Sequence, residues 1–130
     1  MFYFRLTPDG CCAHIRFDYP VSQYTGNPDI QYNLHYAGTT ADGIGYWVDE
    51  NDSSKVLYKK TNGVIWQMGT GGLNGLSKHG EIYSPDTKCP PFEDSNGYSW
   101  DFSFPHTFTC IGVQSTTTPE TTTTTVAVGG

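Results

Sequence analysis

Four cysteines are the residues of this chain with the clearest chemistry: Cys11, Cys12, Cys89 and Cys110. An even number of cysteines in a small chain rich in glycine and strand-forming residues is typical of disulfides made in an oxidising compartment. Adjacent cysteines are too close for a relaxed disulfide, because bridged Cα atoms usually lie ~4.4–6.8 Å apart. We therefore expect Cys11 and Cys12 each to bridge one of Cys89 and Cys110, which leaves two pairings open.

A zinc site is the alternative use of the first two cysteines, with His14 as a further ligand. Structural zinc sites usually take pairs of ligands separated by two to four residues. Adjacent cysteines bind one ion poorly, and the chain has no Cys-x-x-Cys pair. Disulfides are the preferred interpretation, and we expect no metal and no other cofactor.

No recognisable catalytic constellation is present. The four histidines, His14, His35, His79 and His106, are scattered, and there is no Gly-x-Ser-x-Gly elbow. Asp and Glu residues gather in loops without a recognisable pair. A hydrolase fragment would need a cleft with two carboxylates about 5–10 Å apart. The sequence predicts a protein that is not an enzyme.

The hydrophilic stretch 49–55 carries two candidate sites. Asn51-Asp52-Ser53 is an Asn-x-Ser/Thr sequon, which in a secreted eukaryotic protein accepts an N-glycan on a surface loop. The spacing of Asp49, Asn51 and Ser53 also matches the oxygen ligands of a calcium loop, but the glycine and the glutamate that complete such a loop are missing. Asn51 is therefore predicted to carry a glycan, and calcium is the weaker alternative.

Aromatic residues make up 15% of the chain, and exposed aromatic rings can stack on sugars. The candidates are Trp47, Trp66 and Trp100. Trp66 and Trp100 share their strand faces with other apolar residues, which predicts that both lie in the core. Trp47 shares its face with Asp49, so we expect Trp47 to be exposed and to be the sugar-stacking residue.

Short strands must position these residues. The stretch 45–83 contains four runs of β-branched and aromatic residues separated by turn residues, which is typical of an antiparallel meander. The turn Lys-Thr-Asn-Gly at 60–63 joins the second and third runs, and Asn-Gly tolerates the positive φ of a tight hairpin. Within the third run Trp66 and Gln67 point to opposite faces.

Other strands are predicted from an apolar run at 1–6 and from alternating patterns at 11–17, 30–36 and 98–104, and a last strand at 108–113 carries Cys110. Fifteen glycines and eight prolines exclude long helices from most windows. The sequence predicts an all-β fold, a small antiparallel β-sandwich or barrel stapled by disulfides. We expect an N-terminal strand segment at 1–10, a β-domain at 11–114 and an extended Thr-rich tail at 115–130.

The net charge argues against a nucleic-acid partner, and the hydropathy argues against a membrane-spanning segment. The net charge of −6 argues against nucleic acid, because nucleic-acid binding requires a basic patch. No apolar run approaches the length of a membrane span. We expect no nucleic-acid partner and no membrane-spanning segment.

The tail differs sharply in composition from the rest of the chain. A Thr-rich tract that contains proline cannot bury a core, and it is typical of an O-glycosylated stalk or linker. The predicted O-glycan acceptors are Thr116, Thr117, Thr118, Thr121, Thr122, Thr123, Thr124 and Thr125.

The order of several weak motifs resembles a known group of proteins. Gly-Tyr-Trp at 45–47, Val-Ile-Trp-Gln-Met at 64–68, Cys-Pro-Pro at 89–91 and Thr-Cys-Ile-Gly-Val at 109–113 follow one another in this chain. This order is similar to that of short secreted β-domains that occur in tandem in large extracellular proteins, joined by Thr/Pro-rich linkers. It also resembles subunits of glycan-coated extracellular fibrils. The resemblance implies a structural or adhesive protein without catalytic residues.

We therefore expect a secreted structural module that carries covalent glycans and associates with copies of itself, head to tail, into a fibril or a tandem-repeat fibre. The apolar run 1–6 would be an aggregation hazard if its edge were free. The segment 124–128 has the β-branched composition to add as a strand to a neighbouring sheet. A carbohydrate-binding or adhesion module is the alternative, and an exposed row of aromatic rings would favour it.

Overall fold

The fold is all-β, as the sequence predicts. The computed structural model describes residues 2–3, 7–85, 87–94, 97–111 and 113–114. Its main element is one antiparallel sheet of eight strands in the order β8-β7-β6-β5-β4-β3-β2-β9. These strands are β2 (His14–Tyr19), β3 (Ile30–Thr39), β4 (Gly45–Asp49), β5 (Val56–Lys59), β6 (Ile65–Gly69), β7 (Lys78–Tyr83), β8 (Asp101–Phe102) and β9 (Thr107–Cys110). No helix within the described ranges is long and apolar enough to cross a membrane.

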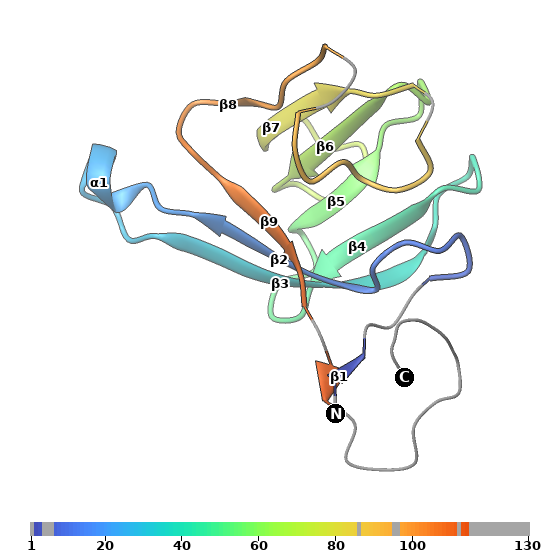
Figure 1. Cartoon of the computed structure of the whole chain (residues 1–130). Coiled ribbons are helices and arrows are strands. Elements are labelled where there is room, and N and C mark those ends of the chain that lie inside the picture. Colours follow the sequence, from blue (N-terminus) through green and yellow to red (C-terminus); the bar gives the residue numbers. More distant parts are fainter. Residues whose placement is uncertain (1, 4–6, 86, 95–96, 112, 115–130) are drawn as a thin grey trace.

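The sheet curls on itself, so of the two predicted architectures the barrel is the closer description (Figure 1). Its edge strands β8 and β9 follow each other along the chain. Phe102 of β8 stacks on His106, just before β9, with 3.9 Å between the ring centres. Across the interior, the ring of Phe17 on β2 lies 5.5 Å from that of Phe102. The two edges of the sheet are thus brought together by aromatic packing.

The predicted meander is confirmed, because β4, β5, β6 and β7 are consecutive neighbours in the sheet. The hairpin between β5 and β6 turns at 60–63. Gly63 has φ of +75° and donates its backbone N–H to the carbonyl oxygen of Lys60 at 2.8 Å. Asn62 instead accepts the backbone N–H of Val64 with its side-chain oxygen, at 3.0 Å. The positive φ of the turn therefore falls on the glycine.

Two predicted strands have different bounds in the structure. β3 continues to Thr39, beyond the predicted end at residue 36, through a β-bulge between Tyr36 and Gly38. The strand predicted at 98–104 is reduced to β8. The backbone N–H of Trp100 is bound by the carboxylate of Asp94 at 3.0 Å, so this group is not available to a strand ladder.

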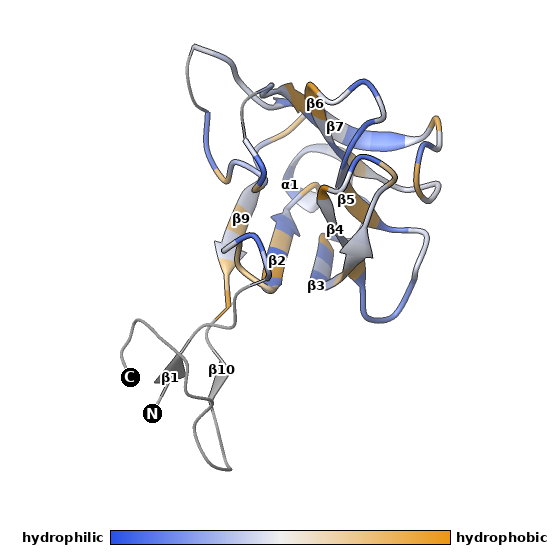
Figure 2. Cartoon of the chain, turned by 90° about the vertical axis from the view of Figure 1, so that its right-hand side faces the viewer, coloured by the Kyte–Doolittle hydropathy of each residue, from blue (hydrophilic) through white to orange (hydrophobic). Residues whose placement is uncertain are grey.

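The strands on either side of the barrel sequence pair with each other outside the barrel. β1 (Phe2–Tyr3) runs antiparallel to β10 (Val113–Gln114), with Phe2 opposite Gln114. The predicted strand 108–113 is therefore divided between β9, in the barrel, and β10. We call this β1–β10 pair the terminal ribbon. Figures 1 and 2 show it projecting from the end of the barrel where β9 finishes.

The connections between strands fall at two ends of the barrel, because neighbouring strands are antiparallel. One end carries the connections 20–29, 50–55, 70–77 and 103–106. We call it the α1 end, after the short helix α1 (Ser22–Thr25) in the first of these connections. The other end carries the connections 40–44, 60–64 and 84–100, together with the start of β2 and the end of β9. We call this the disulfide end.

Hydrophobic side chains from the inward faces of the strands fill the barrel. The alternation predicted at 11–17 is confirmed, with Ile15 and Phe17 buried and Arg16 exposed. Trp66 and Trp100 are buried as predicted, with exposed fractions of 0% and 7%. The largest fully buried side chains are Trp47, Trp66, Tyr58, Phe17, Ile15, Leu34, Leu57, Met68, Ile82, Gln67 and Val56.

Candidate functional site

Two disulfides define the disulfide end. They join Cys11 to Cys89 and Cys12 to Cys110. The expectation that each of the adjacent cysteines bridges a distant one is confirmed, and the structure selects one of the two pairings that the sequence left open. The zinc alternative is wrong, because the sulfur atoms of Cys11 and Cys12 are committed to these bonds.

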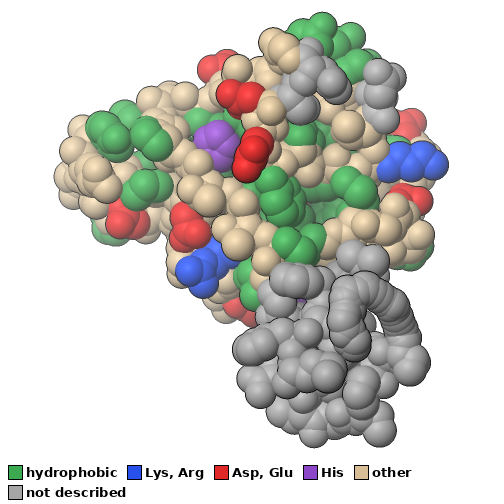
Figure 3. All heavy atoms as spheres, in the orientation of Figure 1, with side chains coloured by type: hydrophobic (Ala, Val, Ile, Leu, Met, Phe, Trp, Pro, Cys, Tyr) green, Lys and Arg blue, Asp and Glu red, His purple; other side chains and the backbone are tan. Residues whose placement is uncertain are grey.

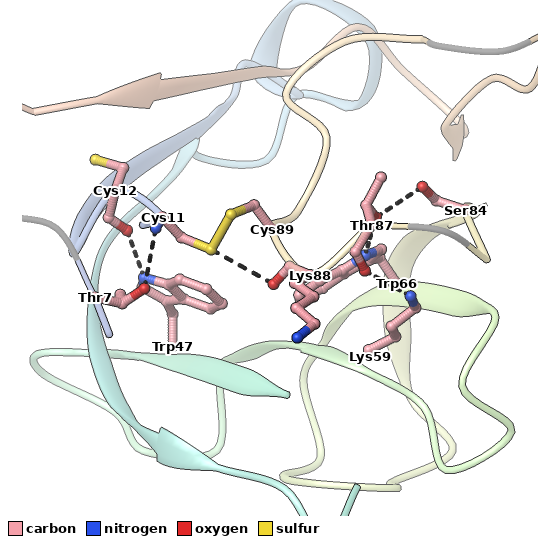
Figure 4. The surroundings of a disulfide bond; sticks show 10 residues. All are labelled: Thr7, Cys11, Cys12, Trp47, Lys59, Trp66, Ser84, Thr87, Lys88 and Cys89. Carbon is pink, nitrogen blue, oxygen red and sulfur yellow. Dashed lines mark hydrogen bonds between the residues drawn. A yellow bond between two sulfur atoms is a disulfide. The ribbon is translucent and has the colours of Figure 1, made fainter. Parts of the chain in front are cut away.

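The pairing follows from the directions of adjacent side chains. Neighbours in an extended chain point to opposite faces, so Cys11 and Cys12 meet different elements. Cys11 is buried and reaches Cys89 in the 84–100 connection, which crosses the disulfide end (Figure 4). Cys12 is half-buried and reaches Cys110, the last residue of β9.

A turn fixes the chain just before the cysteines. The backbone N–H of Thr7 donates to the carbonyl oxygen of Cys11 at 2.7 Å, and the N–H of Cys11 donates to the hydroxyl oxygen of Thr7 at 3.1 Å (Figure 4). Gly10 completes the turn with φ of +83° and donates its N–H to the carbonyl oxygen of Thr7 at 2.9 Å. These hydrogen bonds therefore hold the turn at 7–10 next to the Cys11–Cys89 disulfide.

The expectation that Trp47 is exposed and stacks on sugars is wrong, since its exposed fraction is 0%. Its indole N–H donates to the carbonyl oxygen of Cys12 at 2.9 Å, close to the Cys11–Cys89 disulfide (Figure 4). Asp49, the polar residue on the same strand face, is itself only 7% exposed. Its carboxylate accepts the backbone N–H groups of Asn33 at 3.0 Å and Asn51 at 3.1 Å. From the sequence alone, this buried and hydrogen-bonded aspartate could not be distinguished from one that faces solvent. For that reason Trp47 was predicted to be exposed.

The connection that carries Cys89 is held by two side chains of the barrel interior. The indole N–H of Trp66 donates to the hydroxyl oxygen of Thr87 at 3.0 Å. The ammonium group of Lys59, which is 4% exposed, donates to the carbonyl oxygens of Thr87 at 2.6 Å and Pro85 at 3.2 Å. These bonds position Cys89 over the interior (Figure 4).

A tyrosine–histidine pair lies inside the α1 end. The hydroxyl group of Tyr32 is 2.9 Å from Nε2 of His79. His79 stands at a register shift of β7, which turns its ring inward against Tyr19 at 5.3 Å between ring centres. Burial, and then the charges of Asp49 and Asp52, raise the pKa of Tyr32 to about 12. Burial, and then the charge of Lys55, lower the pKa of His79. Both groups are therefore neutral at pH 7.

The sequon lies in the 50–55 connection at the α1 end, and Asn51, Asp52 and Ser53 are all exposed. Asp52 accepts the backbone N–H and the hydroxyl group of Ser54, at 3.0 and 2.6 Å, and these bonds lower its pKa. Within the described ranges no three His, Cys, Asp or Glu side chains are placed to hold a metal ion. The loop is folded by its own hydrogen bonds, and glycosylation of Asn51 stays a prediction.

Exposed aromatic rings were predicted at Trp47, but they lie around α1 instead. Tyr24 is 54% exposed, and its ring stacks on Phe104 with 5.2 Å between ring centres and 17° between ring planes. Phe104 in turn lies 6.1 Å from Tyr19, so three rings form a row from the interior to the surface. Figure 3 shows hydrophobic side chains gathered around α1 on this face. Spacing in sequence did not indicate this row, because its rings come from three separate elements.

A hollow of ≈ 320 Å³ lies beside the inner ring of this row. Its lining combines Tyr19, Pro20 and Ile30 with the polar residues Asp18, Asp29 and Gln31. A hydrogen bond from Ser22 lowers the pKa of Asp29, so this carboxylate is ionised at neutral pH. Three of the six lining residues are polar, so the lining is more polar than that of most small-molecule sites.

The predicted O-glycan acceptors at 116–118 and 121–125, and the tail at 115–130, lie outside the described residues. Comparison of the chain with protein-family models, curated proteins and solved structures finds no match.

Proposed function

We propose that this chain is a secreted, non-enzymatic structural module whose copies associate head to tail into a glycosylated fibre. The observation that carries the proposal is the terminal ribbon, in which β1 pairs with β10 and neither strand joins the eight-stranded sheet. A strand pair contributed by the two chain ends can form within one copy or, with the same backbone hydrogen bonds, between two copies. When β1 of each copy pairs with β10 of the next, the contact does not close on itself and a filament grows.

The small size of the terminal ribbon supports exchange between copies. Each of its strands has two residues, and an isolated two-stranded ribbon is marginally stable at best in water. Little stability within one copy is therefore lost when the strands separate. A neighbouring copy supplies the same pairing and further strand-forming residues at 124–128.

The positions of the disulfides and of the sequon support the secreted and glycosylated part of the proposal. Disulfides persist in oxidising compartments, and this domain has two. Asn51 lies at the α1 end of the barrel, whereas the terminal ribbon projects from the disulfide end. A glycan on Asn51 therefore leaves the pairing strands accessible.

Cysteine cross-linking tests the exchange of strands. Phe2 and Gln114 are partners in the ribbon, so a Phe2→Cys/Gln114→Cys variant places two thiols opposite each other. After mild oxidation at increasing protein concentration, we expect a ladder of covalent multimers on a non-reducing gel. The bond joins β1 of one copy to β10 of the next, so the ladder continues beyond dimers.

The matched controls are the two single variants, Phe2→Cys and Gln114→Cys. Each has one added thiol and can form nothing larger than a covalent dimer. A double variant that runs only as an internally bridged monomer at every concentration would show that the ribbon closes within one copy, and it would contradict the proposed assembly.

Carbohydrate binding at the α1 end is the second candidate function. The observation that favours it is the row of rings ending at the exposed Tyr24, beside a hollow with polar groups. Sugar rings stack their apolar faces on aromatic side chains while their hydroxyl groups bond to nearby carboxylates and amides. The hollow is lined by Asp29, whose carboxylate also accepts the backbone N–H of Ser22 at 3.0 Å, and by Gln31, whose side-chain amide also donates to Asp18 at 2.8 Å.

Removal of the outer ring tests this second function. In titration calorimetry with glucose and galactose oligosaccharides, Tyr24→Ala is expected to weaken binding about fivefold, since one stacking contact contributes ~1 kcal/mol. Tyr98→Ala is the control, because Tyr98 is similarly exposed (45% against 54%) but packs against Tyr83, away from α1. Binding that is absent in the wild type, or equal in both variants, would exclude a sugar site here.

A further inference from the structure

The bond between Cys12 and Cys110 joins the segment that leads into the barrel to the segment that leads out of it. Cys12 lies two residues before β2, and Cys110 is the last residue of β9. The two cysteines are 98 residues apart in sequence, and all eight strands of the barrel lie within that interval. A covalent path therefore runs from one end of the chain to the other without passing through the barrel.

We infer that Cys12–Cys110 has a mechanical function: it transmits tension between the two chain ends, so that pulling on the ends does not unfold the barrel. The setting of this inference, a fibre under tension, rests on the proposed function. The covalent path itself belongs to a single copy and is independent of assembly.

The order of events under tension follows from the geometry of the disulfide end. In the terminal ribbon Phe2 is opposite Gln114, so pulling on the outer ends opens the two residue pairs one after the other. The turn at 7–10 is released next, because hydrogen bonds between Thr7, Gly10 and Cys11, and no disulfide, hold it. Tension next reaches Cys12 and passes through the sulfur–sulfur bond to Cys110. This covalent path bypasses the hydrogen bonds of β2 with β3 and β9, which therefore carry none of the tension.

The other disulfide, Cys11–Cys89, limits how far the chain can extend when Cys12–Cys110 is absent. If Cys12–Cys110 is absent, tension entering at Cys11 passes directly to Cys89, and the segment between these two cysteines, which are 78 positions apart, stays protected. Only the stretch from Cys89 to Cys110, about 20 residues, is then able to extend, by roughly 70 Å. If both bonds are absent, the full separation of 98 residues extends, by roughly 320–350 Å.

Force spectroscopy on single copies of the full chain, held by DNA handles at its two ends, tests this inference. For the oxidised wild type we expect no extension beyond release of the terminal segments. Cys12→Ser/Cys110→Ser is expected to add roughly 70 Å, and replacement of all four cysteines roughly 320–350 Å. The matched control is Cys11→Ala/Cys89→Ala, which also lacks one disulfide but is expected to behave like the wild type.

An added extension of roughly 320–350 Å in the oxidised wild type would overturn the inference, and so would equal extensions in the two double variants. The final extended length depends on which covalent bonds remain, so a variant that fails to fold still gives a decisive length. Because single copies are measured, the result stands whether or not the cross-linking experiment finds a ladder of multimers.

Discussion

Replacing Cys12 and Cys110 by serine is expected to lower the free energy of unfolding by about 4–5 kcal/mol. The bond closes a loop of 98 residues, and in the chain-entropy model a loop of this length restricts the unfolded chain strongly. A loss of this size is comparable with the whole stability of a small domain, ~5–15 kcal/mol. Urea unfolding followed by tryptophan fluorescence measures it, because Trp47, Trp66 and Trp100 are all buried.

The Cys11→Ala/Cys89→Ala variant is the matched comparison. Its loop of 78 residues is only slightly shorter, so the chain-entropy model gives a loss smaller by just ~0.2 kcal/mol. Alanine is chosen because Cys11 is buried, where a serine hydroxyl would need a hydrogen-bond partner. An unfolding midpoint that does not move in either variant would show that the disulfides are not formed in the native protein.

Trp47→Ala is expected to lower the free energy of unfolding by about 3–5 kcal/mol. The ring is fully buried and packs against Trp66 at 6.1 Å and Tyr36 at 5.8 Å between ring centres. Truncation leaves a cavity between these rings and removes the donor to the carbonyl oxygen of Cys12. Thermal and urea unfolding of the oxidised protein measure the loss.

Two further variants separate the causes of this effect. Trp47→Phe keeps most of the apolar volume but lacks the N–H, so we expect a smaller loss of ~1–3 kcal/mol from the carbonyl oxygen that loses its donor. Tyr24→Ala removes an aromatic ring that is 54% exposed, and its effect on stability is expected to be much smaller. If Trp47→Ala were no more destabilising than Tyr24→Ala, the burial of Trp47 described above would be wrong.

The features predicted correctly from the sequence are those set by local patterns. The meander follows from alternation and turn residues, and the hairpin at 60–63 follows from the glycine that its positive φ requires. The disulfides followed from a geometric exclusion, since Cys11 and Cys12 are too close to bridge each other. The choice between the two remaining pairings needed the fold, which directs Cys11 inward to Cys89.

The features that could not be predicted depend on contacts between distant segments. Gln67 looks like a solvent-facing residue, yet it is 2% exposed because the 70–77 connection folds over it. Its side-chain amide donates to the hydroxyl oxygen of Tyr58 at 3.0 Å and to the carbonyl oxygen of Gly75 at 3.4 Å. The burial of Trp47 was missed for a similar reason, because the buried Asp49 on the same strand face accepts the backbone N–H of Asn33, on a distant segment, as well as that of the nearby Asn51.

The position of β2 in the sheet has a consequence for the synthesis of the chain. β2 is the first barrel strand to be made, and one of its two neighbours, β9, is the last. Until residues 107–110 leave the ribosome, one edge of β2 has no partner, and Ile15 and Phe17 lack part of their cover. Strand pairings between such distant segments form slowly. The barrel is therefore completed only after synthesis of its last strand, and Cys89, which emerges before Cys110, permits Cys11–Cys89 to form first.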